Sequence, residues 1–183
     1  YHGQWEEDKM EGEGIYTSTI GNHYEGNFSD GRLDGPGSFR SYLGETYIGD
    51  WLSGRMHGQG LYIFANGSKY EGTWVNDKRT GYGVYNYANG SVYEGSFKNG
   101  KREGKGKFKK INNEIYDGDW EADRMHGQGN YFFENGNTYI GKWVNDMMSG
   151  EGLLSFYDGE KYKGSFLNNE ISGEGTMSHS DGR

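Results

Sequence analysis

Residues 70–90 read YEGTWVNDKRTGYGVYNYANG, and the spacing of aromatic residues and glycines in this stretch decides the fold. The first part, Y-x-G-x-W, and the second part, G-x-G-x-Y, place these residue types at every second position. A period of two is typical of β-strands, whose side chains alternate between the two faces of a sheet. Turn-forming residues separate the two parts and follow the second one. The stretch therefore predicts two strands that form a hairpin.

The same pattern returns every 23 residues without a gap. The motif Y-x-G begins eight times, at Tyr1, Tyr24, Tyr47, Tyr70, Tyr93, Tyr116, Tyr139 and Tyr162. Four residues after each tyrosine stands Trp5, Phe28, Trp51, Trp74, Phe97, Trp120, Trp143 or Phe166, and every repeat also contains a G-x-G. A fixed period of this length indicates a repeat protein.

Composition indicates what holds these repeats together. Only 32% of the 183 residues are hydrophobic, but 16% are aromatic, which is more than disordered chains normally contain. The core is therefore predicted to be aromatic. The chain has no cysteine, which favours an intracellular location, and its formal net charge is −8.

The repeat consensus Y-x-G-x-W…G-x-G-x-Y/F…N-G resembles the MORN (membrane occupation and recognition nexus) repeat, and the resemblance covers the whole chain. It implies an all-β fold: an elongated antiparallel β-hairpin repeat array that forms a single-layer twisted rod or groove of up to sixteen strands. We expect residues 1–183 to form a single MORN-repeat array that is a segment of a longer protein. The resemblance also implies roles in cytoskeletal, ciliary or basal-body structures, at membrane–cytoskeleton junctions, or as myosin-binding adaptors.

Turn residues predict the register within each repeat. Pairs such as Gly54-Arg55 and Gly100-Lys101 fit two-residue hairpin loops with glycine first, whereas Ala65-Asn66-Gly67 fits a three-residue loop with glycine in the left-handed conformation. Two equal nine-residue strands then remain in each repeat. We expect one face to carry the pairs Tyr70–Tyr85, Gly72–Gly83, Trp74–Gly81 and, with the preceding repeat, Trp74–Gly58. In this register, glycine leaves room for an indole ring over the neighbouring backbone.

Residues 97–110, FKNGKREGKGKFKK, contain seven of the 19 basic residues. The alternation predicts that most of them lie on the outward face, opposite the aromatic residues. This candidate patch for an anionic ligand consists of Lys98, Lys101, Arg102, Lys105, Lys107, Lys109 and Lys110. It would attract anionic lipid, an acidic protein segment or a nucleic-acid backbone. The alternative is a solvated face that keeps the sheet soluble.

A second candidate surface is apolar. A single-layer sheet has nothing over its outer face, so contiguous apolar residues there indicate a protein interface. The alternative is that valine and leucine only serve β-propensity. The predicted interface face consists of Leu52, Leu61, Ile63, Val75, Val84, Phe132, Val144, Leu153 and Leu167.

The sequence predicts no active site, no metal site and no cofactor. His57 and His126 occupy identical RMHGQG contexts three repeats apart, too far to share a metal ion. The G-x-G pairs precede strand residues rather than a helix, so they do not predict phosphate loops.

The leading hypothesis is a non-catalytic scaffold or adaptor that binds a protein partner, such as a cytoskeletal or ciliary component or a helix laid in a groove. A homodimer or end-to-end self-association is a further expectation, and no nucleic-acid partner is expected. The alternative is peripheral binding to anionic phosphoinositides through the basic patch of the fifth repeat. The expected location is cytoplasmic and cytoskeleton-associated, including the inner face of a membrane.

Overall fold

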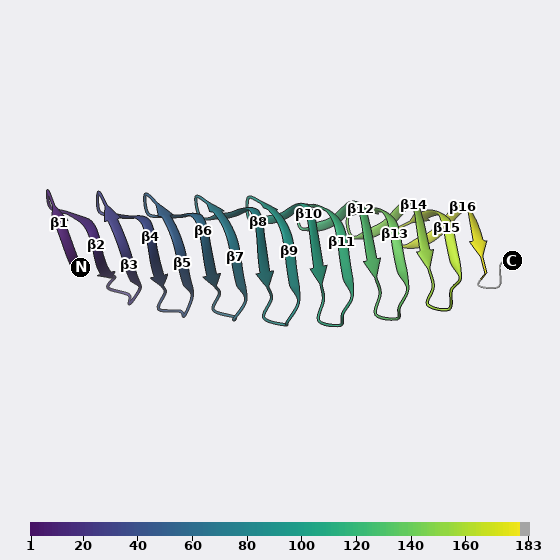
Figure 1. The fold of residues 1–183 in the computed structure, drawn as a ribbon, viewed down its shortest axis with the longest axis horizontal. Helices are drawn as coiled ribbons and strands as arrows, with labels where there is room; N and C mark the ends of the chain where they lie inside the picture. The colour runs from purple at the N-terminus through teal and green to yellow at the C-terminus, as the bar shows by residue number, and fades with distance from the viewer. Residues whose placement is uncertain (180–183) are drawn as a thin grey trace. The chain divides into compact units, whose positions relative to one another are not determined.

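The computed structural model describes residues 1–179, which form sixteen β-strands and no helix (Figure 1). Within that part of the chain, no helix is therefore long and apolar enough to cross a membrane. The strands pair antiparallel and follow one another in chain order. The all-β prediction of an antiparallel hairpin repeat array is confirmed.

The first strand of each repeat is β1 (His2–Glu6), β3 (His23–Ser29), β5 (Thr46–Leu52), β7 (Lys69–Val75), β9 (Val92–Lys98), β11 (Ile115–Glu121), β13 (Thr138–Val144) or β15 (Lys161–Leu167). The second strand is β2 (Lys9–Thr17), β4 (Arg32–Arg40), β6 (Arg55–Ile63), β8 (Lys78–Asn86), β10 (Lys101–Lys109), β12 (Arg124–Phe132), β14 (Met147–Ser155) or β16 (Glu170–Ser178).

The chain divides into two compact units, which we describe separately. The first unit comprises residues 1–88 and 97–100, and the second comprises residues 89–96 and the chain from residue 101 onward.

A β-bulge modifies the predicted register within the hairpins of the first four and the last three repeats. In the fourth repeat, Gly72 pairs with Gly83 and Tyr70 with Tyr85, as predicted, and Gly58 lies beside Trp74. The predicted pairing of Trp74 with Gly81 is wrong, because Trp74 pairs with Arg79. Two extra residues at the bulge, Gly81 and Tyr82, cause the difference, and Gly81 has a φ of 59°.

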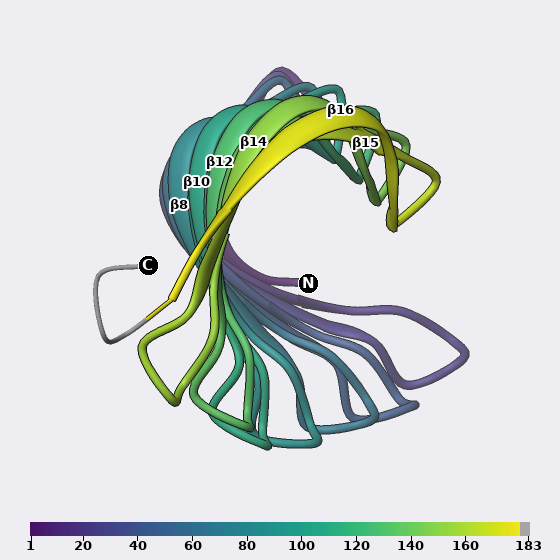
Figure 2. The same cartoon turned by 90° about the vertical axis from the view of Figure 1, so that its right-hand side faces the viewer.

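The bulge also makes the two strands of a repeat unequal. In the sixth repeat, β12 has nine residues, whereas β11 has seven rather than the predicted nine. A bulge bends the strand that carries it. Figure 2 shows this bending in β10, β12 and β14 of the second unit.

The turns confirm one prediction and correct another. The three-residue loop is as predicted: Phe64 donates its N–H to the Ser68 carbonyl, and Gly67 has a φ of 84°. The two-residue turns begin one residue earlier than predicted. They comprise Ser53–Gly54 and Asn99–Gly100, for example, with positive φ at both positions, so glycine is second. This conformation is the type I′ turn, which matches the twist of a hairpin.

The core lies on one face of the sheet and consists of tyrosine rings laid across pairs of glycines. Tyr116 is 1% exposed, and its ring crosses the backbone of Gly118 and Gly129. Its hydroxyl donates to the Asp119 carbonyl at 2.7 Å, and its ring meets that of Trp120 edge to face at 5.2 Å. The predicted aromatic core is thus confirmed, but the ring over the glycine pair is tyrosine rather than an indole.

The indole has a different role, which joins neighbouring repeats. Trp143 donates its Nε1–H to the Gly129 carbonyl at 3.2 Å and packs edge to face on Tyr116. Trp74 and Trp120 form the same hydrogen bond with Gly60 and Gly106, so these indoles join their strands to the preceding repeats.

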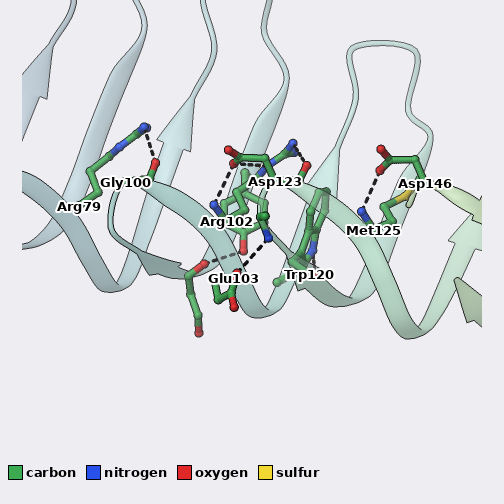
Figure 3. A network of polar contacts seen from close by, with 12 residues as sticks. Arg79, Gly100, Arg102, Glu103, Trp120, Asp123, Met125 and Asp146 are labelled. Carbon is green, nitrogen blue, oxygen red and sulfur yellow. Dashed lines mark hydrogen bonds and ion pairs between the residues drawn. The ribbon is translucent and has the colours of Figure 1, made fainter. Parts of the chain in front are cut away.

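Hydrogen bonds between successive two-residue turns form a second link between repeats (Figure 3). Asp123 donates its N–H to the Arg102 carbonyl at 3.0 Å, and its carboxylate accepts the Arg102 N–H at 2.9 Å. Asp146 and Met125 form the same pair of bonds one repeat later. Backbone groups at this edge are therefore satisfied by the neighbouring repeat.

Candidate binding surfaces

The side chains that alternate with the buried aromatic residues lie on the opposite, outward face of the sheet. Cross-strand pairing orders those of the second unit into two rows. The first row is Lys107, Asp117, Asn130, Ile140, Leu153, Lys163 and Thr176. The second row is Lys109, Ile115, Phe132, Thr138, Ser155, Lys161 and Ser178.

The residues of the predicted basic patch are divided between the two units. Lys98 belongs to the first unit, and the other six residues belong to the second. Arg102 turns to the aromatic side, where its guanidinium carbon lies 4.1 Å from the centroid of Trp120 and Nη2 donates to the Asp123 carbonyl at 2.6 Å. Arg102 therefore does not face outward with the exposed lysines.

Two other lysines of the patch have carboxylate partners. Lys105 Nζ lies 2.6 Å from an Asp119 carboxylate oxygen. Lys110 Nζ donates to Glu114 at 2.8 Å and to the Tyr131 hydroxyl at 2.6 Å. The hydrogen bond from Lys110 holds the pKa of Glu114 below its usual range. Lys101, Lys107 and Lys109 are exposed and form no ion pair within residues 1–179.

The predicted apolar face is divided between the units. In the first unit, Leu52 and Val75 are exposed, and three residues are partly exposed: Leu61, Ile63 and Val84. In the second unit, Phe132 and Leu167 are exposed, and two residues are partly exposed: Val144 and Leu153.

Sequence reasoning missed Ile48, Ile140 and Ile115 on this face, and Ile115 pairs with Phe132. Ile48 is 53% exposed and pairs with Leu61, and Ile140 is 52% exposed and pairs with Leu153. Each follows the repeat tyrosine directly, so strict alternation from Tyr47 and Tyr139 would have placed both on the outward face. In the first unit, a hollow of about 410 Å³ is lined by Ile48 together with Ile15, Glu25 and other residues.

The histidines of the two RMHGQG motifs lie in different units. His57 lies opposite Asp50, and His126 lies opposite Asp119. His126 Nδ1 is 3.4 Å from a Glu121 carboxylate oxygen. No group of three or more histidine or acidic side chains within residues 1–179 is placed to hold a metal ion.

Comparison with protein families agrees with the repeats. The family model described as "MORN repeat" matches eight consecutive segments, which are residues 1–23, 24–42, 47–69, 70–92, 93–114, 116–138, 139–161 and 162–182. No significantly similar sequence is found among curated proteins.

Solved structures include domains of similar architecture. The TCP10 domain of Danio rerio CPAP has a TM-score of 0.52 and 10% identity, over 92% of this chain and 79% of that chain. The TCP domain of Drosophila melanogaster SAS-4 (dCPAP), described in complex with a proline-rich motif of Ana2, has a TM-score of 0.49 and 13% identity, over 93% of this chain and 86% of that chain. The likeness to the Danio rerio domain is one of fold.

Proposed function

Because the chain belongs to the MORN repeat family, we propose that it is a non-catalytic scaffold that binds a protein partner through the outward face of its sheet. The setting we propose is a cytoskeletal, ciliary or basal-body assembly, or a membrane–cytoskeleton junction. The family membership supports the scaffold role, and the surface of the chain supports the use of the outward face.

The single observation that carries the proposal is the exposure of paired apolar side chains on this face. Ile48 lies beside Leu61, and Ile140 beside Leu153, each as cross-strand neighbours. The tyrosine rings lie on the opposite face, and residues 1–179 contain no second sheet or helix that covers these pairs. Exposed apolar residues that are contiguous, rather than scattered, mark interaction surfaces.

Binding to anionic lipid through the fifth repeat is less well supported. Arg102 is held on the aromatic side, and Lys105 and Lys110 are paired with carboxylates. A protein with a formal net charge of −8 also repels an anionic membrane over longer distances.

The proposal is tested by purifying the tagged chain from ciliated cells and identifying proteins that accompany it by mass spectrometry. The test variant carries Ile140→Asn and Leu153→Asn. A matched control carries Ile111→Asn and Tyr157→Asn, two apolar residues that are exposed in loops. We expect the test variant to lose its specific partners and the control to keep them.

A second arm measures flotation with phosphatidylcholine vesicles that contain phosphatidylinositol 4,5-bisphosphate, at near-physiological salt. Partner recovery that is equal in both variants, together with flotation of the wild-type chain, would refute the scaffold proposal and favour the lipid alternative. Imaging of the tagged chain before and after microtubule depolymerisation tests the cytoskeletal setting.

A further inference from the structure

Four apolar side chains run diagonally across the outward face of the second unit. Ile115 pairs with Phe132 in one row, and Ile140 pairs with Leu153 in the other. Phe132 and Ile140 lie on adjacent strands one row apart, so the two pairs adjoin. Phe132 is 46% exposed and Ile140 is 52% exposed, although both are apolar.

Lysines flank the apolar residues of both rows on either side. Strand β10 contributes Lys107 and Lys109, and strand β15 contributes Lys161 and Lys163. All four are exposed, and none forms an ion pair within residues 1–179. Asp117 is the one carboxylate that lies in the rows between them. We call these lysines and the four apolar residues the lysine-framed patch.

The frame does not follow from the repeat consensus. Four repeats earlier, the first unit has the same apolar pair, Ile48 and Leu61. There, however, Glu71 stands where the second unit has Lys163, and Ile15 stands where it has Lys107. Lys69 stands where the second unit has Lys161, so the first unit keeps one lysine of the frame and has an acidic residue in place of another.

From this arrangement we infer that the lysine-framed patch docks an acidic amphipathic segment of a protein partner, with apolar residues at its centre and carboxylates at both ends. The inference rests on the proposed function and specifies the partner's chemistry. Apolar side chains of the segment cover Phe132 and Ile140, and its carboxylates meet the lysines of β10 and β15. Complementary charge of this kind selects the partner and its orientation.

The spacing of the frame limits the length of the segment. Strands β10 and β15 are five strand intervals apart, which corresponds to about 24 Å at about 4.8 Å per interval. A helix spans that distance in about 16 residues at 1.5 Å per residue. An extended chain spans it in about seven residues at roughly 3.3 Å per residue.

The experiment selects displayed random peptides of about 20 residues on the immobilised 183-residue chain, a length that covers either conformation. Affinities of the enriched peptides are then measured by fluorescence anisotropy at near-physiological salt. We expect the enriched peptides to carry Asp or Glu on both sides of apolar residues, with an affinity that falls as salt rises.

Charge reversal identifies where these peptides bind. The test variant carries Lys107→Glu, Lys109→Glu, Lys161→Glu and Lys163→Glu. The control carries Arg40→Glu, Lys69→Glu, Lys78→Glu and Lys98→Glu, which change the net charge equally but lie in the first unit. We expect the test variant to lose at least about tenfold in affinity and the control less than about twofold, because only the first set faces the peptide.

A second pair of variants tests the apolar residues. Ile140→Asn should weaken binding of the peptides, and its counterpart Ile48→Asn should not. Near-UV circular dichroism verifies that each variant is folded. If the fourfold variant does not fold, a double variant with Lys107→Gln and Lys163→Gln replaces it.

Several results would overturn the inference: an empty selection, enriched peptides without acidic residues, or equal losses in the test and control variants. Binding to phosphatidylinositol 4,5-bisphosphate vesicles that depends on the same four lysines, without acidic peptides, would assign the frame to a membrane instead. If partners recovered from cells depend on Ile140 and Leu153 but not on the four lysines, this inference fails and the proposed scaffold function stands.

Discussion

At the scale of single residues, the fold depends on the contact between a tyrosine ring and two glycines. A Cβ at Gly129 would lie 2.4 Å from Cε2 of Tyr116 and 2.5 Å from its hydroxyl oxygen. No other residue fits under the ring unless the ring moves. Because the ring also packs on Trp120 and Trp143, a shift would disturb two repeats.

We therefore predict that Gly129→Ala lowers the free energy of unfolding by about 1–3 kcal/mol, the usual cost of overpacking a core. The control is Gly67→Asn, at a loop position where nothing lies within 4 Å of an added Cβ. Asparagine tolerates the left-handed backbone of such a loop, and Asn113 already occupies one with a φ of 65°. Urea denaturation followed by tryptophan fluorescence measures both. Equal effects of the two substitutions would contradict the role given to the tyrosine ring.

At the scale of elements, the two-residue turns show how residue choice and backbone conformation are matched. Asn76, Asn99, Asn145 and Asn168 occupy the first turn position with φ between 48° and 52°. Ala122 occupies the same position in the sixth repeat, with a φ of 48°. This left-handed conformation is sterically unfavourable for alanine and less unfavourable for asparagine.

We predict that Ala122→Asn raises the free energy of unfolding by about 0.5–1 kcal/mol, the difference in left-handed backbone cost between the two residues. The reverse change at an equivalent turn, Asn145→Ala, should lower it by a similar amount. Differential scanning calorimetry on both variants measures the two shifts. A loss of stability in Ala122→Asn would show that the left-handed turn does not limit this repeat.

At the scale of the whole molecule, the repeated tyrosines make stability depend on pH. Burial raises the pKa of Tyr70, in the first unit, and of Tyr139, in the second unit, to about 12 each. Burial also raises the pKa of Tyr47 and Tyr116. An unfolded tyrosine ionises near about 10, so the unfolded chain releases these protons at lower pH than the folded chain does. The stability contributed by the protonated tyrosines is complete below about pH 10 and is lost as the pH rises towards 12.

We predict that the denaturation midpoint falls steeply between about pH 10 and 11.5, the range in which the unfolded tyrosines ionise first. A variant with Tyr70→Phe and Tyr139→Phe should show a shallower fall, because it has two fewer groups with raised pKa values. Denaturant titrations at closely spaced pH values measure both slopes. Identical slopes would mean that other groups control the alkaline transition.

Some features of the site were open to prediction and others were not. The period of 23 and the alternation within each repeat assign the tyrosines that begin the repeats from Tyr47 onward, and the tryptophans from Trp51 onward, to the core. They assign Lys105, Lys107 and Leu153 to the outer face. The bulge escaped prediction for a physical reason: it adds two residues, and an even insertion leaves every side chain on its original face. The hydrophobic pattern is therefore the same with and without the bulge, although the bulge moves Trp74 from Gly81 to Arg79.

The sequence by itself determined the repeat, the all-β class and the face on which the core lies, because these follow from local periodicity. Only the tertiary structure decided which outward side chains become neighbours, because that depends on register across successive hairpins. Pairing across strands placed Arg102 over Trp120 and gave Lys105 and Lys110 carboxylate partners. It also set Ile140 and Leu153 between the lysines of β10 and those of β15, which are more than fifty residues apart in the chain.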